Sequence, residues 1–176
     1  MTMTLVSTVT VGAGGAASID FTSIPQTGTD LLIVISGRGT ASVNNDNLSL
    51  TLNGNTGSIY TRKTLYGTGS GTGSATGTYA KFYGAAYPGA SATSNTFGNV
   101  SFYIPNYANG ANKSISVDSV TEHNGTEANQ TISAGLFAST AAITSLALVA
   151  EGGNFAQYST ASLYTIQVGS GGATVS

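Results

Sequence analysis

The sequence predicts an all-β protein, an antiparallel β-sandwich of jelly-roll type that forms a single domain over residues 1–176. Three observations lead to this prediction. Apolar and polar residues alternate with the period of two that a half-buried strand requires, whereas the 3.6-residue period of a helix is almost absent. Turn residues divide the chain at short intervals, as in sandwiches. Finally, no helical stretch separates the apolar runs, although the crossovers of a parallel sheet need one.

The clearest alternation places Leu48, Leu50 and Leu52 on one face of a strand and hydroxyl or amide side chains on the other. A second segment alternates in the same manner from Ile115 to Glu122, and a continuous apolar run at Leu31 to Ile35 predicts a central strand. In chain order, the predicted strands lie at residues 3–11, 18–21, 31–36, 48–53, 58–66, 78–87, 99–104, 115–122, 130–137, 143–150 and 160–168.

Turn and loop signals lie between these strands. Asn53-Gly54, Asn109-Gly110 and Asn124-Gly125 are strong turn dipeptides because Asn and Gly tolerate a positive φ. The run from Gly67 to Thr78 reads GTGSGTGSATGT and predicts a flexible loop, and residues 169–176 predict a flexible Gly-rich tail. The Ala-rich stretch at residues 138–146 is interpreted as a turn that leads into a strand.

The composition excludes several classes of function. Only 7% of the residues are charged, against roughly 25% in an average soluble domain, while 26 Thr, 22 Ser and 13 Asn supply uncharged polar groups. Five Lys and Arg with a net charge of −2 cannot form the basic surface that nucleic acid or an acidic membrane requires. No apolar run reaches the roughly 20 residues of a membrane-spanning helix. The absence of Cys excludes disulfides and thiolate sites.

Catalytic chemistry finds little support, and we expect neither an enzyme nor a cofactor. The only histidine, His123, follows a strand whose alternation puts Asp118 and Glu122 on the opposite face. No Gly-x-Ser-x-Gly elbow accompanies it, so we interpret His123 as a strand-end residue that is solvated or at an interface. Asp118 and Glu122 share a face, but four residues of strand separate them by about 13 Å. Solvated acids are the better interpretation.

A metal site is also not expected. Asn44-Asn45-Asp46-Asn47 gathers oxygen ligands of the kind that calcium accepts, just before a predicted strand. The spacing differs from that of an EF-hand loop. Asn and Asp favour tight turns in any case, so a turn is the preferred interpretation and calcium the minor alternative.

Two groups of side chains are candidate contact residues for a protein partner. In the predicted strand at 78–87, Tyr79, Tyr83 and Tyr87 share a face, and tyrosine is typical of contact surfaces. An inward orientation of these rings is an equally good alternative. The leading strand or arm at residues 1–11 is the second group, with Leu5 and Val9 as its contact side chains, because an extended segment can add to the edge of a neighbour's sheet.

Several segments carry a resemblance to a known module. These are Gly14 to Pro25, Thr29 to Val34, Phe97 to Tyr107, Asn112 to Val120, Gly152 to Phe155 and Tyr158 to Tyr164. As a series they resemble a β-sandwich module of tailed-bacteriophage structural proteins, which occurs as a small virion protein or appended to larger tail and fibre proteins. The resemblance covers residues 14 to 168 and identifies a scaffold without a chemical site.

The resemblance implies a jelly-roll-like virion component. Because the module fills nearly the whole chain, the expected function is a capsid decoration or cement protein on the outer capsid surface, which bridges capsomers. Its expected partners are the major capsid protein or other virion proteins and further copies of itself, with a trimer favoured. The alternative is a tail-fibre or receptor-binding module that binds host glycans through the loops at residues 67–78, 44–47 and 124–129.

Overall fold

The computed structural model describes residues 2–125 and 128–167, which contain twelve strands and no helix. No helix in this part of the chain is long and apolar enough to cross a membrane. The strands are β1 (Thr2–Thr10), β2 (Ser18–Phe21), β3 (Asp30–Gly37), β4 (Asn45–Leu52), β5 (Tyr60–Gly67), β6 (Thr72–Tyr79), β7 (Phe82–Pro88), β8 (Gly98–Ile104), β9 (Lys113–Thr121), β10 (Asn129–Phe137), β11 (Leu146–Ala150) and β12 (Thr160–Gln167).

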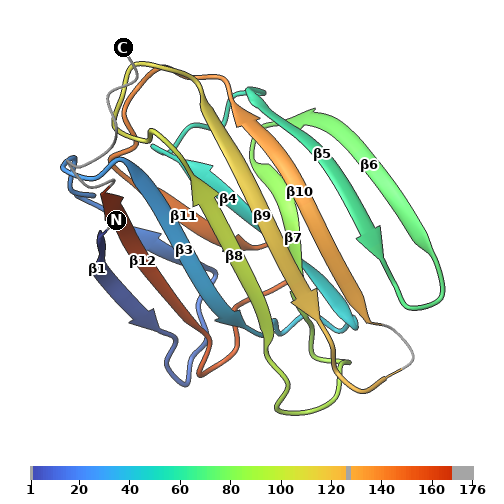
Figure 1. Ribbon diagram of the computed structural model, residues 1–176. Coiled ribbons are helices and arrows are strands. Elements are labelled where there is room, and N and C mark those ends of the chain that lie inside the picture. Colours follow the sequence, from blue (N-terminus) through green and yellow to red (C-terminus); the bar gives the residue numbers. More distant parts are fainter. Residues whose placement is uncertain (1, 126–127, 168–176) are drawn as a thin grey trace.

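These strands form two antiparallel sheets that pack face to face (Figure 1). The large sheet has eight strands in the order β1-β12-β3-β8-β9-β10-β5-β6, and the small sheet has four in the order β2-β11-β4-β7. The prediction of an antiparallel, jelly-roll-like β-sandwich is therefore confirmed. Figure 1 also shows that the large sheet is wider than the small one, because β5 and β6 extend beyond it.

The core lies between the two sheets and follows the alternation that the sequence predicts. Leu31 and Ile33 of β3 and Phe102 of β8 point inward and are fully buried. Leu48, Leu50 and Leu52 of β4 face them from the small sheet and are equally buried. Phe82 of β7 meets Phe102 edge to face, with the ring centroids 6.4 Å apart. The side of the large sheet that faces away from the small sheet is called the outer face below.

Residues 67–78, predicted as a loop, instead form most of a β-hairpin. Only residues 68–71 turn, closed by a bond from the Thr68 amide to the Gly71 carbonyl (2.8 Å), and β6 pairs with β5 along its whole length. The chain then turns again at residues 80–81, so the predicted strand at 78–87 is divided between two sheets. The pairing partner β5 stabilises β6, since its own Thr, Gly and Ser have no apolar alternation. The predicted tail at residues 169–176 lies outside the described residues.

Two β-bulges shift the alternation of side chains. In β1, Leu5 pairs with Tyr164 and Ser7 with Leu163, which makes Val6 an extra residue. In β7, Ala85 pairs with Leu48 and Tyr83 with Ser49, which makes Gly84 an extra residue. A bulge of this kind places residues on its two sides on opposite faces relative to simple alternation. Both bulges lie inside segments that the sequence had assigned to contact surfaces.

Candidate functional site

The three tyrosines predicted to share a face lie in three different settings. Tyr79 ends β6 in the large sheet, whereas Tyr83 and Tyr87 belong to β7 in the small sheet. Tyr83 points outward and is partly exposed, but the bulge at Gly84 turns Tyr87 into the core, where it is fully buried. The prediction of a common face is wrong because alternation assumes an uninterrupted strand.

Tyr79 and Tyr83 nevertheless touch, across the gap between the two sheets. Their rings meet edge to face at a centroid distance of 5.4 Å. The guanidinium of Arg62 lies 5.2 Å from the Tyr79 ring centre, which is a cation–π geometry, and it donates a hydrogen bond to the Tyr83 carbonyl (2.7 Å). These contacts join β5, β6 and β7 at one edge of the sandwich.

Glu151 extends this group onto the small sheet. Its carboxylate accepts hydrogen bonds from the hydroxyls of Ser49 (2.5 Å) and Tyr83 (3.4 Å), and it forms an ion pair with Lys81 (3.0 Å). The carboxylate thus has three internal partners. We therefore interpret the Tyr79–Tyr83 contact as part of a structural link between the sheets.

Tyr87 is a core residue. Its ring stacks on Phe155 with 5.6 Å between the centroids, and its hydroxyl donates to the carboxylate of Asp46 at 3.4 Å. Burial raises the pKa of Tyr87, and the charge of Asp46 raises it further. Tyr87 thus takes the inward orientation that the sequence left open as an alternative.

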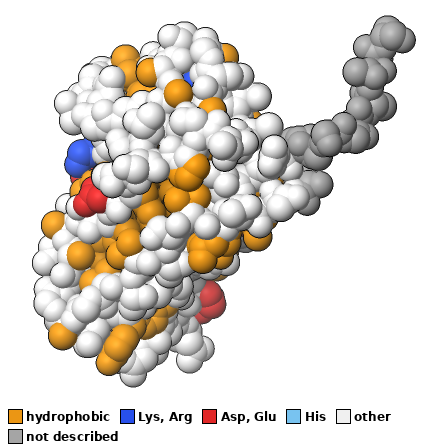
Figure 2. Space-filling model, turned by 90° about the vertical axis from the view of Figure 1, so that its left-hand side faces the viewer, with side chains coloured by type: hydrophobic (Ala, Val, Ile, Leu, Met, Phe, Trp, Pro, Cys, Tyr) orange, Lys and Arg blue, Asp and Glu red, His pale blue; other side chains and the backbone are white. Residues whose placement is uncertain are grey.

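The leading strand β1 is the outermost strand of the large sheet. Leu5 lies on the outer face and is 53% exposed, whereas Val9, beyond the bulge at Val6, packs against the core. Of the two predicted contact side chains, Leu5 is therefore available to a partner. Figure 2 shows this side of the molecule, where hydrophobic side chains lie among uncharged polar ones and charges are few.

His123 is buried rather than solvated, with 4% of its surface exposed. Among the residues that the structure describes, neither ring nitrogen has a hydrogen-bond partner, and the neighbouring Thr121 hydroxyl is buried without one as well. Glu122 points to solvent and accepts a bond from the Asn124 amide (2.6 Å), while Asp118 is exposed on the outer face of β9. The structure thus brings neither Asp118 nor Glu122 to the His123 ring.

The Asn44 to Asn47 segment begins β4 instead of forming only a turn. Asp46 is buried, and besides Tyr87 it accepts a bond from the Asn47 amide at 2.8 Å. Among the described residues, no group of three or more His, Cys, Asp or Glu side chains is arranged to hold a metal ion.

Other buried polar side chains fix the loop between β8 and β9. Asp30 accepts hydrogen bonds from the Tyr103 hydroxyl (2.6 Å) and the Asn106 amide (3.0 Å), and the bond to Asp30 raises the pKa of Tyr103. Lys113 is fully buried and donates to the carbonyls of Asn109 and Ala111, and burial lowers its pKa. Asp30 and Lys113 bond to backbone groups of this loop and do not form an open site.

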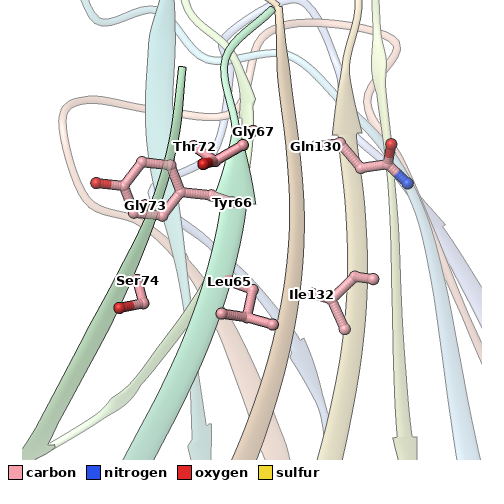
Figure 3. Close-up of a pocket in the computed structure, with 8 residues that line it drawn as sticks. All are labelled: Leu65, Tyr66, Gly67, Thr72, Gly73, Ser74, Gln130 and Ile132. Atoms are coloured by element: carbon pink, nitrogen blue, oxygen red, sulfur yellow. The ribbon is translucent and has the colours of Figure 1, made fainter.

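An apolar pair on the outer face was missed by the sequence reasoning. Leu65 of β5 and Ile132 of β10 pair directly across the strands and are 67% and 57% exposed. They lie side by side in a shallow hollow that Tyr66, Ser74 and Gln130 also line (Figure 3). On the opposite, inner face the neighbouring Thr64 and Ser133 hydroxyls bond to each other at 2.8 Å. The polarity of β5 and β10 is therefore inverted at this point, and Thr131-Ile132-Ser133 is the signal that could have revealed it.

Comparison of the chain with protein-family models, with curated proteins and with solved structures finds no significant match.

Proposed function

We propose that the chain is a bacteriophage virion structural protein, a capsid decoration or cement protein that stabilises the head by bridging neighbouring capsomers. The observation that carries the proposal is the local inversion of polarity in β5 and β10, where Leu65 and Ile132 are exposed and the hydroxyls of Thr64 and Ser133 are buried. Apolar side chains on an otherwise hydroxyl-rich surface favour adhesion to a partner. The virion setting is supported by the sequence resemblance.

The proposed partner of this surface is the major capsid protein on the outer surface of the head. Full burial of a Leu or Ile side chain contributes roughly 1.5–3 kcal/mol, so one copy supplies only weak adhesion through Leu65 and Ile132. A homo-oligomer, with a trimer favoured, would present several such surfaces at once. Binding through several surfaces raises the overall affinity without any new type of contact.

The mechanism would be adhesion alone. A protein that binds the assembled shell and not the free subunits shifts the equilibrium toward the shell by mass action. At a free concentration of 100 times Kd, this stabilisation is about 2.7 kcal/mol for each site. No bond is made or broken in this mechanism, and it needs no cofactor.

The test is the copy number of the chain in purified virions of its source, measured by quantitative mass spectrometry against the major capsid protein. A fixed ratio near that of capsid subunits or capsomers is expected for head decoration. A handful of copies per particle would reject the decoration proposal in favour of a tail location. Complete absence would reject both virion functions.

A second test addresses the surface itself. Isolated capsids that lack the protein should gain heat resistance when wild-type chain is added, and Leu65→Asp or Ile132→Asp should abolish this gain. Tyr158→Asp is the matched control, because Tyr158 is 68% exposed on a loop away from the pair. Equal loss with the control variant would contradict the role of Leu65 and Ile132.

The alternative, a tail-fibre or receptor-binding module, is supported by the same hollow. Thr72, Ser74 and Gln130 line it beside the apolar pair, and a combination of apolar, hydroxyl and amide groups suits a sugar. Of the loops proposed from the sequence, residues 67–78 and 44–47 lie largely in strands. Specific binding to a host-glycan panel that Gln130→Ala removes, and Tyr158→Ala retains, would favour this function.

A further inference from the structure

Both edge strands of the large sheet lack charged residues and prolines, and the bulge at Val6 in β1 is the one irregularity in their described pairing. Among the described residues, β1 pairs only with β12 and β6 only with β5, and neither strand contains a charged residue or a proline. Edge strands usually carry such residues because their free backbone groups attract other strands. The small sheet shows this protection, since its edge strand β2 carries an exposed Asp20 and its edge strand β7 ends in Pro88.

The hydrogen-bond pattern between each edge strand and its neighbour determines which backbone amides point to the free edge. Because the Thr68 amide bonds to the Gly71 carbonyl, the next pair, Gly67 with Thr72, is of the type without hydrogen bonds. Alternation along β6 then directs the amides of Thr72, Ser74, Thr76 and Thr78 away from β5. In β1, the bond from the Val11 amide to the Ser159 carbonyl (2.8 Å) likewise directs the amides of Thr8 and Thr10 away from β12.

We propose that copies of this chain associate head to tail, with β1 of one copy pairing with β6 of the next. The large sheet has eight strands, all antiparallel, so β1 and β6 run in opposite directions. A second copy in the same orientation therefore continues the antiparallel ladder across the junction. The two strands also match in length, with nine residues in β1 and eight in β6.

Pairing of unlike edges suits these strands better than pairing of like edges. In a β6–β6 pair, the row of Gly73, Ala75 and Gly77 would meet a second such row, and small residues offer little cross-strand contact. A β1–β1 pair would bring together two strands that are both interrupted by the bulge at Val6. In a β1–β6 pair, Met3 and Leu5 on the outer face of β1 meet the Thr and Ser side chains of β6, whereas Val9 on the inner face meets the row of Gly73, Ala75 and Gly77. Only one of the two strands is irregular.

A head-to-tail contact of this kind closes into a ring or continues as a filament, depending on the rotation between copies. In either case the outer faces of the copies form one continuous surface. Met3 and Leu5 of one copy, which are 56% and 53% exposed, would then lie on the same face as Leu65 of the next. The inference concerns the chain alone and does not depend on the virion setting.

The experiment blocks one edge at a time. Thr8→Pro and Thr76→Pro each remove an amide that points to the free edge, so neither removes a bond of the sheet's own ladder. Thr8→Val and Thr76→Val are matched controls that keep the amide. Light scattering during size-exclusion chromatography measures the mass at concentrations up to about 500 µM, where even a Kd of about 100 µM gives mostly assembled chain.

The expected result is that each blocked variant is monomeric alone and that the two variants together form a dimer. Wild type and both Val controls assemble, each Pro variant alone has the 17.5 kDa monomer mass, and a 1:1 mixture of the two forms a species of twice that mass and nothing larger. Mixing restores one junction because each variant keeps the edge that the other lacks. Far-UV circular dichroism and thermal unfolding establish that both variants fold, and Thr8→Lys with Thr76→Lys replaces the pair if either does not.

Three results would overturn the inference. A monomeric wild type at all concentrations excludes edge pairing. A blocked variant that dimerises by itself shows that like edges pair with each other. A mixture that remains monomeric while the Val controls assemble shows that β1 and β6 are not partners.

Discussion

The large sheet is stabilised in two different ways at its two ends. In β3 and β8, inward side chains such as Ile33 and Phe102 are fully buried beneath the small sheet. In the β5–β6 hairpin, which extends beyond the small sheet in Figure 1, the inner side of β6 carries Gly73, Ala75 and Gly77. The rings of Tyr66 and Tyr79 lie directly over Gly73 and Gly77. The first region is thus held by apolar burial, and the hairpin by its backbone ladder and two partly exposed rings.

This difference indicates where the protein is available to others. A region that buries little apolar surface opens at a lower free energy than the core. The region that the small sheet covers, which includes β3 and β8, is called the covered region. It fixes the shape of the sandwich, while the β5–β6 hairpin presents its outer face and its edge. The exposed pair of Leu65 and Ile132 and the unprotected strand β6 both lie at this end of the sheet.

The largest expected effect comes from truncating one aromatic ring in each region. Phe102→Ala should lower the free energy of unfolding by about 3–5 kcal/mol, because it leaves a cavity in a fully buried site. Tyr66→Ala should cost less than about 1 kcal/mol, since Tyr66 is 38% exposed and solvent replaces the ring. Urea unfolding of both variants measures the two losses. Equal losses would show that the hairpin is as firmly packed as the covered region.

A pair of Gly→Ala substitutions tests whether tight packing is confined to the region beneath the small sheet and is absent from the hairpin. A Cβ at Gly135 of β10 would overlap the ring of Phe82, which is fully buried. Gly135→Ala should therefore destabilise the protein by about 1–3 kcal/mol. Gly67→Ala in β5 meets open space and should be neutral or slightly stabilising. Thermal unfolding distinguishes the two, and a neutral Gly135→Ala would mean that Phe82 is free to shift.

The sequence predicted the covered region well and the hairpin poorly. Alternation located β4 and β9 because burial of one face selects apolar residues at every second position, and a continuous apolar run located β3. It could not locate β6, whose Thr, Ser and Gly follow no apolar period, and it extended one strand across the turn at residues 80–81. A strand that is stabilised mainly by pairing with its neighbour needs no apolar alternation in its own sequence.

The candidate contact residues failed for a related reason. The bulges at Val6 and Gly84 each insert one residue, which separates Leu5 from Val9 and Tyr83 from Tyr87. A single-residue change of register is invisible in composition, yet it moves every later side chain to the other face.

Alkaline pH tests the covered region without altering its packing. Burial and two carboxylates raise the pKa of Tyr87, so above about pH 10 the folded chain binds more protons than the unfolded chain. The free energy of unfolding must then fall as the pH rises. Tyr87→Phe keeps the stack on Phe155 and should make this fall shallower by up to about 1.4 kcal/mol per pH unit.

Lys113 changes the free energy of unfolding with pH in the opposite direction, because burial lowers its pKa. Lys113 is present in both proteins, so its contribution cancels when their slopes are compared. Denaturant unfolding of wild type and Tyr87→Phe between pH 9 and pH 11 measures the two slopes. Identical slopes would show that Tyr87 reaches solvent in the folded protein.

The smallest expected effect concerns the link between the hairpin and the small sheet. Lys81, in the turn between β6 and β7, pairs with Glu151 while both side chains remain partly exposed at 30% and 23%. Such a pair contributes about 0.2–1 kcal/mol and is screened by salt. Lys81→Met should therefore lower the free energy of unfolding by no more than this, and the difference from wild type should shrink in 1 M salt. Glu151→Gln should cost more, because Ser49 and Tyr83 also donate to this carboxylate. If Lys81→Met costs as much as Glu151→Gln, the ion pair and not the hydroxyl bonds holds the hairpin against the small sheet.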